Sequence, residues 1–337
     1  MTQRDDSQSE IAPVGTAPTP PTPSTPPTAP HSRSRRTRAV AGFAIGLVLL
    51  AAAVWGFFSQ AHTVDLARQS LRSAHPLSMI LLVVLPLVNW VLSAESFLAL
   101  TRRFAPVPRS DMLALIGSAW LFNYLPLRPG LFGRVAFHKA VHGVRVRDSA
   151  RVIVQSILGS AVALAALAGA TLLSRTMGPA PMLGLLVFAP GLVMSMWFAS
   201  DDTQHQGSLA VRVFLGVVGL KILDGMVWTA RYMLAFQLAG SPIGVGEALA
   251  VAVVAQAAML IPLAGNGLGV REWSVALLAA SLPAWYAAPS ADSSAQVTVG
   301  IGLAADLICR AAELLIAVPT GLVCTAWIAR KFRRVRA

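Results

Sequence analysis

The chain has 337 residues, of which 55% are hydrophobic and only 12% charged. Soluble domains carry about 25% charged residues, so this composition excludes an ordinary soluble protein and predicts a helical membrane protein. The net charge of +12 lies in short arginine clusters beside apolar runs rather than on a soluble basic face, which excludes a nucleic-acid partner and points to membrane topology and to contacts with anionic lipids.

Residues 1–38 differ from the rest of the chain. The stretch 11–30 is mostly Pro, Thr, Ala and Ser, which cannot bury enough apolar surface to fold, so we expect a disordered cytoplasmic tail. The apolar run 39–58 follows a basic segment. Its three alanines at 51–53 resemble a signal-peptide cleavage site, but the long preceding region and the later apolar runs favour an uncleaved anchor. We expect residues 39–337 to form one transmembrane domain.

Long apolar runs define the predicted spans. A helix needs about 20 apolar residues to cross the hydrocarbon core of a bilayer. The fold class is therefore an all-α polytopic membrane protein. Six runs qualify as full spans: 39–58, 77–100, 150–173, 181–199, 211–239 and 297–328.

Two other regions, 111–143 and 247–288, are interrupted. Each begins with about 15 helical residues, stops at a proline, passes through a Gly-rich turn and resumes as a helix. A 15-residue helix is only about 22 Å long, shorter than the ~30 Å hydrocarbon core. We expect two re-entrant helical hairpins, with two fully spanning pairs as the alternative.

Lysine and arginine set the expected orientation, because they are enriched in cytoplasmic loops. With residues 33–38 in the cytoplasm, the loop 101–110 and the segment 330–336 fall on the same side. The loops 240–246 and 286–296 fall outside and contain neither Lys nor Arg. We expect an integral protein of the cytoplasmic (inner) membrane with both termini in the cytoplasm. The basic clusters on that side are Arg33, Arg35, Arg36 and Arg38; Arg102, Arg103 and Arg109; Arg145, Arg147 and Arg151; and Arg330, Lys331, Arg333, Arg334 and Arg336.

The two interrupted regions resemble each other. Asp111 precedes Pro126 by the same fifteen residues as Glu247 precedes Pro262, and glycines and an arginine follow each proline. By the orientation above, the first copy enters from the cytoplasm and the second from outside, which makes an inverted repeat. In transporters such repeats place the substrate site near the membrane midplane. The alternative is that the breaks only let helices pack closely.

Polar residues in these regions are the candidate substrate site. Arginine offers a planar fork for phosphate, and a helix that starts after a Gly turn offers free N–H groups, so a phosphate-bearing headgroup would suit them. If the arginines only anchor the hairpins among lipid headgroups, lysine would serve as well. The candidates are Asn123, Arg128, Gly130, Arg134, Asn266, Gly267, Arg271 and Glu272.

Charged residues inside the predicted spans are a second group, because such charges are costly and usually face the protein interior. Lys221 and Asp224 are three residues apart and can pair, and Asp306 shares a helix face with Arg310 and Glu313. Pairing that fixes helix register and a role in substrate or proton movement remain equal alternatives. The residues of this group are Glu95, Lys221, Asp224, Arg310 and Glu313.

Motifs for catalysis and for metal binding are missing. The chain has no Gly-x-Ser-x-Gly, His-Glu-x-x-His or Walker sequence, and Asp224-Gly225 lacks the downstream aspartates of a CDP-alcohol phosphotransferase. His138 and His142 have no evident third ligand, and Cys309 and Cys324 suggest neither a disulfide nor a metal site. We therefore expect no enzyme activity, no cofactor and no metal.

Two motifs resemble a known family. The segment 123–130, Asn-Tyr-Leu-Pro-Leu-Arg-Pro-Gly, followed by Arg134, is similar to the first motif of the lysylphosphatidylglycerol synthase transmembrane-region family. The segment 261–272, Ile-Pro-Leu-Ala-Gly-Asn-Gly-Leu-Gly-Val-Arg-Glu, is similar to its second and is the more specific match. The resemblance covers about residues 40–330. Many members carry an acidic residue where this chain has Leu131, and the soluble aminoacyl-transferase domain of the full synthase is not expected here.

The resemblance implies a flippase-like protein, with relatives linked to dolichol-phosphate sugars and to hopanoid lipids. It implies translocation of a lipid or lipid-linked intermediate between leaflets, with the motif residues Arg128, Gly130, Arg134, Asn266, Gly267, Arg271 and Glu272 at the site. The alternative is a non-transporting scaffold subunit for a lipid- or glycan-modifying enzyme, which would make a lipid-synthesis enzyme its partner. A membrane-embedded transferase is disfavoured by the missing motifs.

Overall fold

The computed structural model describes residues 44–45, 47–56, 58–59, 61–125, 129–197, 206–260, 265–286 and 297–336. Within these residues the chain is helical and contains no strand, as expected for the predicted class. The tail 1–38, the two prolines of the repeat and Arg128 lie outside the described residues.

Four long helices run along the bundle: α3 (Pro76–Thr101), α6 (Val146–Met177), α8 (Gln206–Leu238) and α11 (Val299–Arg336). By length and composition, α3 and α6 are the described helices that could cross a membrane unaided. α8 and α11 coincide with predicted spans, but they contain buried charged residues. The remaining elements are a helical stretch Leu47–Gly56, α2 (Ala61–Ser73), α4 (Arg109–Phe122), α5 (Pro129–His142), α7 (Ala180–Trp197), α9 (Val245–Leu260), the 3₁₀ turn η1 (Gly265–Gly267) and α10 (Val270–Tyr286).

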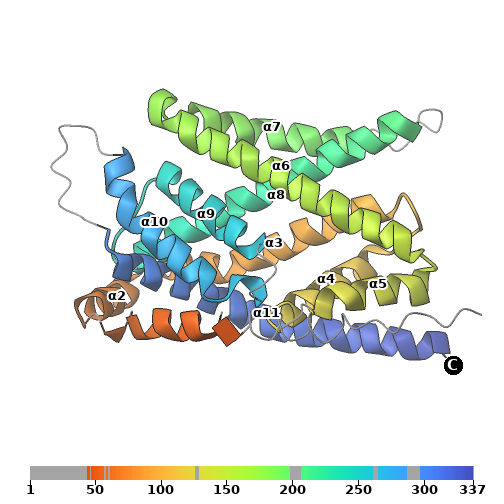
Figure 1. Ribbon diagram of the computed structural model, residues 1–337, viewed down its shortest axis with the longest axis horizontal. Helices are drawn as coiled ribbons and strands as arrows, with labels where there is room; N and C mark the ends of the chain where they lie inside the picture. The colour runs from red at the N-terminus through yellow and green to blue at the C-terminus, as the bar shows by residue number, and fades with distance from the viewer. Residues whose placement is uncertain are drawn as a thin grey trace, which may run out of the picture.

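Both interrupted regions fold as two short helices around a break. α4 and α5 have 14 residues each, and α9 and α10 have 16 and 17. At 1.5 Å per residue these helices are about 21–26 Å long. The α4–α5 pair opens toward one end of the bundle and the α9–α10 pair toward the other, so that their breaks meet near the middle (Figure 1).

The basic segments gather at one end of the bundle. α3 ends, α4 begins, α5 ends, α6 begins and α11 ends on the right-hand side of Figure 1. Most of the arginines assigned to the cytoplasmic side flank or lie in these helix ends. The opposite end, where α8 ends and α9 begins, is joined by the short connection 239–244, which has no Lys or Arg.

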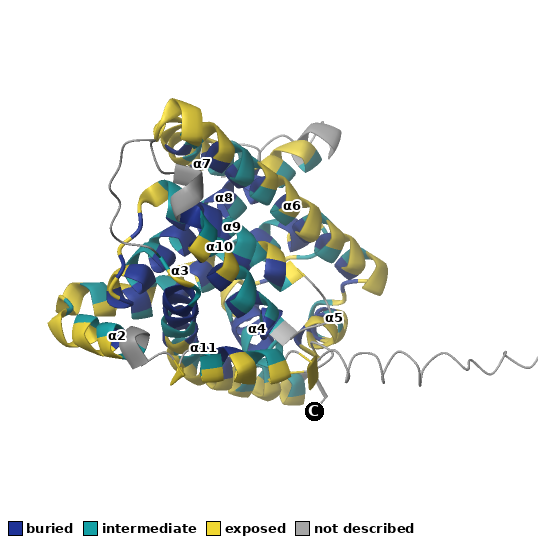
Figure 2. Cartoon of the chain, turned by 60° about the vertical axis from the view of Figure 1, so that its left-hand side comes forward, coloured by how far each residue is buried: buried dark blue, intermediate teal, exposed yellow. Residues whose placement is uncertain are grey.

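The bundle has a buried centre and an exposed outer face (Figure 2). Small residues let its helices approach closely: a Cβ on Gly302 of α11 would lie 2.7 Å from the Cα of Ala276 on α10. On the outside, large apolar side chains are exposed, including Val187 at 78% and Phe188 at 61% on α7. Extended apolar surface of this kind is typical of a protein that faces lipid or a partner.

Candidate functional site

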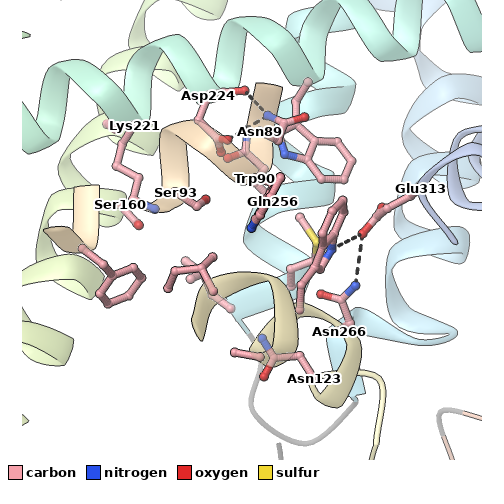
Figure 3. Close-up of a pocket in the computed structure, with 18 of the residues that line it drawn as sticks. Asn89, Trp90, Ser93, Asn123, Ser160, Lys221, Asp224, Gln256, Asn266 and Glu313 are labelled. Atoms are coloured by element: carbon pink, nitrogen blue, oxygen red, sulfur yellow. Dashed lines mark hydrogen bonds between the residues drawn. The ribbon is translucent and has the colours of Figure 1, made fainter. Parts of the chain in front are cut away.

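A cavity of about 270 Å³ lies in the middle of the bundle, between the two interrupted regions (Figure 3). Asn123 closes α4 on one side and Asn266 lies in η1 on the other, so residues beside both breaks line the same cavity. Its volume is close to the ~300–1,000 Å³ range of small-molecule sites. The other polar or aromatic lining residues are Asn89, Trp90, Ser93, Phe97, Trp120, Arg134, Ser160, Lys221, Asp224, Trp228, Arg231, Gln256 and Glu313.

Glu313 of α11 joins the two breaks. One of its carboxylate oxygens, Oε1, accepts hydrogen bonds from Tyr124 Oη at 2.8 Å and Trp120 Nε1 at 3.2 Å, both in the first region, and from Asn266 Nδ2 at 3.4 Å in the second. The other oxygen, Oε2, pairs with Arg231 and Arg271, each at 3.2 Å. A single carboxylate therefore uses both oxygens to connect several helices and a turn around the cavity.

Behind this wall lies a paired layer of buried charge. Arg271 Nε lies 3.0 Å from Asp306 Oδ1, which also accepts a hydrogen bond of 2.6 Å from Tyr232 Oη. Arg310 Nε lies 2.6 Å from Glu272 Oε1. Because none of these four charged residues lines the cavity and each has an opposite charge beside it, the layer needs no ligand to balance its charge.

α8 contributes a second polar wall. Asn89 on α3 donates to Asp224 Oδ1 at 2.7 Å and accepts from Arg231 Nη1 at 3.2 Å. Arg231 also stacks on the Trp228 ring, with 3.9 Å from its guanidinium carbon to the ring centroid. Lys221 lines the same cavity; among the described residues the Asp224 carboxylate accepts its hydrogen bond from Asn89 and has no ion pair with Lys221 within 4 Å.

Arg134 of α5 differs from the other arginines at the centre. It is only 8% exposed and lies over the Phe97 ring at 3.9 Å, but no carboxylate pairs with it among the described residues. Its Nε and Nη1 atoms are buried and have no hydrogen-bond partner there. A buried guanidinium without a counter-charge is costly, and an anion beside it would offset part of that cost.

The structure separates the predicted site residues by location. Asn123, Arg134 and Asn266 line the cavity, together with Lys221, Asp224 and Glu313 from the intramembrane charges. The other described site residues do not line it. Arg271, Glu272 and Arg310 form the paired layer behind it, Gly130 and Gly267 shape the backbone at the two breaks, Glu95 pairs with Arg109 at 2.8 Å on the outside of α3, and Arg128 is not described.

The two glycines act through space and backbone conformation. A Cβ on Gly130 would lie 2.7 Å from the backbone oxygen of Ala119, so only glycine lets α5 start against α4. Gly267 has a φ of 71° and follows Asn266 at 47°, both in the left-handed region. Glycine and asparagine tolerate this region best, which explains the Asn-Gly pair at the second break.

Several lining residues were not predicted from sequence. Trp90, Trp120 and Trp228 and the amides Asn89 and Gln256 lie on ordinary apolar helices and have no motif around them. Polar side chains in the middle of an apolar run were the available signal for the amides, since such groups need internal partners. No family model, curated protein or solved structure matches this chain.

Proposed function

We propose that the chain binds a phosphate-bearing lipid headgroup in the central cavity and translocates the lipid between the leaflets of the inner membrane. The observation that carries this proposal is Arg134, a buried guanidinium that no carboxylate pairs with in the described part of the chain, on the wall of a cavity between the two helix breaks. The apolar outer surface supplies the membrane setting.

The membrane arrangement that we propose has six full spans and two re-entrant hairpins that form an inverted repeat. The short α4–α5 and α9–α10 helices support it, because they enter the bundle from opposite ends and break in the middle. Backbone breaks at membrane depth are tolerated where they line a cavity. The collection of basic segments at one end supports cytoplasmic placement of both termini.

The charge of the cavity favours an anionic ligand. Among the described residues, three cationic side chains line it, Arg134, Lys221 and Arg231, against two anionic ones, Asp224 and Glu313. Arg231 and Glu313 neutralise each other at 3.2 Å. Arg134, Lys221 and Asp224 are then left, a surplus of one positive charge, and the two cations face the Phe97 ring beside open space where a phosphate can accept several hydrogen bonds.

The resemblance of both motif segments to the lysylphosphatidylglycerol synthase transmembrane-region family agrees with this proposal. The residues of those motifs lie in different places. Asn123, Arg134 and Asn266 face the cavity, whereas Arg271 and Glu272 are buried in ion pairs. We therefore assign headgroup contact to the first group and support of the cavity wall to the second.

The paired layer favours one second candidate, a scaffold subunit that transports nothing. Arg271, Asp306, Glu272 and Arg310 need no ligand to balance their charges, and such a core would also suit a protein that only holds a lipid-modifying enzyme. The unpaired Arg134 distinguishes the two candidates, since a scaffold has no use for an uncompensated buried charge.

The test is lipid translocation in proteoliposomes that contain a fluorescent phospholipid, with dithionite bleaching to report the outer leaflet. We expect Arg134→Ala to slow translocation by at least about tenfold, since a hydrogen bond to a charged group contributes about 1.5–3 kcal/mol. Arg134→Lys should retain part of the translocation rate, because lysine keeps the positive charge but cannot make the two parallel hydrogen bonds of a guanidinium group. The matched control is Arg109→Ala, which removes an exposed arginine that pairs with Glu95. A wild-type chain that translocates no phospholipid in this assay would instead favour the scaffold.

A further inference from the structure

A second, much smaller cavity touches the same arginine. It has a volume of about 10 Å³, near the space needed for one water molecule, and lies between α5 and α6. The polar side chains that line it are Thr101, Arg134, His138 and Ser149. Arg134 thus lines both cavities, with His138 one helical turn further along α5.

The polar atoms around this small cavity are unsatisfied. His138 Nδ1 and Ser149 Oγ are buried without hydrogen-bond partners among the described residues, as are Nε and Nη1 of Arg134. His138 is only 4% exposed and Ser149 only 5%. Three unsatisfied side chains around one cavity are unusual, because nearly all buried polar groups in proteins are hydrogen-bonded.

A line of titratable groups leads from this cavity to the basic end of the bundle. Arg134, His138 and His142 follow one another at four-residue intervals on one face of α5, and the two imidazole rings are 5.9 Å apart. His142 Nε2 lies 3.3 Å from the buried Asp111 of α4, which also pairs with Lys331 of α11.

The charges around His138 make its protonation depend on Arg134. On its own helix, His138 faces Arg134 and His142. α4 presents the carboxylate of Asp111, which is already paired with Lys331 of α11. The described polar residues that α6 and α3 contribute to the small cavity are the uncharged Ser149 and Thr101. A proton on His138 is therefore disfavoured first by burial, then by His142 when that ring is charged, and also by the Arg134 guanidinium. An anion beside Arg134 removes the repulsion from that guanidinium.

We propose that His138 is a proton-binding site coupled to the headgroup site, so that one proton enters the protein when the phosphate binds at Arg134. This inference rests on the proposed function. Linkage is reciprocal, so the proton that the anion draws onto His138 must in turn strengthen anion binding. Headgroup affinity is then higher at acid pH and falls as His138 loses its proton. Translocation becomes sensitive to a pH difference across the membrane.

The experiment is calorimetric titration of the full chain in nanodiscs of zwitterionic lipid with dihexanoyl phosphatidylglycerol. This probe is a phosphodiester whose own charge stays constant across the histidine range, so any proton comes from the protein. Titrations in buffers of different ionisation enthalpy give the number of protons taken up. We expect a fraction of a proton per bound lipid, largest near about pH 5, and an affinity that weakens severalfold from about pH 4 to about pH 7.

Two glutamine variants separate the histidines. His138→Gln should still bind the probe but should lose proton uptake and most of the pH dependence of the affinity. If glutamine disturbs folding, His138→Asn is the substitute and should give the same result. His142→Gln is the matched control on the same helix face and should retain uptake. Binding by the wild type without uptake, or equal uptake by His138→Gln and the wild type, would overturn the inference and leave the proposed function standing. No binding of the probe by the wild type would overturn both.

Discussion

At the scale of single residues, buried charge is the feature that most distinguishes this chain. Sequence alone identified Asp306, Arg310 and Glu313 as sharing one face of one helix. It did not identify their partners, because these come from other helices: Arg271 and Glu272 on α10 and Arg231 on α8. Which charge meets which depends on how helices far apart in sequence rotate against one another, and no spacing rule within one helix contains that information.

The Arg310–Glu272 pair gives a prediction about stability. Both side chains are buried, so Arg310→Met should leave Glu272 without its ion-pair partner and cost about 3–5 kcal/mol. Adding Glu272→Gln to the same chain should recover most of that loss. Thermal unfolding of the purified protein in detergent measures both variants. A single variant that unfolds like the wild type, or a double variant that is worse than the single, would show that the pair does not stabilise the bundle.

At the scale of elements, the helix breaks were predictable because proline and glycine act locally. The spacing of the two prolines predicted that each region would contain two short helices, and α4–α5 and α9–α10 are such pairs. The role of each glycine was not predictable, since it depends on what lies opposite. Gly130 lies against the backbone of α4, whereas a methyl group added at Gly133 on the same helix would meet no atom of another element within 4 Å.

These two glycines provide a matched pair of variants. Gly130→Ala should destabilise the protein by about 1–3 kcal/mol, because the new methyl group meets the backbone of Ala119 and must push α5 away from α4. Gly133→Ala should be neutral, or stabilising by up to about 1 kcal/mol, because alanine is the better helix former. The unfolding temperatures of the two variants decide the matter. Equal effects would mean that the close contact between α4 and α5 does not hold the first break in place.

At the scale of the whole molecule, the separation of charge gives a prediction about topology. Because basic residues are concentrated at one end of the bundle, reporter fusions after residues 38 and 330 should both report the cytoplasm. A fusion in the connection 239–244 should report the opposite side. A periplasmic signal from either terminal fusion would contradict the inverted orientation of the two interrupted regions.

The whole-molecule architecture was only partly accessible from sequence. Composition and long apolar runs predicted an all-helical chain, and the described residues contain helices and no strand. The cavity could be placed between the breaks, but its aromatic wall of Trp90, Trp120 and Trp228 could not be predicted. These side chains meet only after α3, α4 and α8 have packed, and an apolar helix gives no local sign of which tryptophan faces inward.

The central claim is that the cavity holds a phosphate-bearing headgroup at Arg134. The most direct measurement is an electron cryomicroscopy structure of the full chain in nanodiscs of anionic phospholipid. We predict phosphate density in the cavity between Asn123 and Asn266, with its oxygens about 3 Å from the Arg134 guanidinium. A cavity without phosphate, with lipid headgroups only at the two ends of the bundle and Arg134 paired with a carboxylate of the protein, would contradict it.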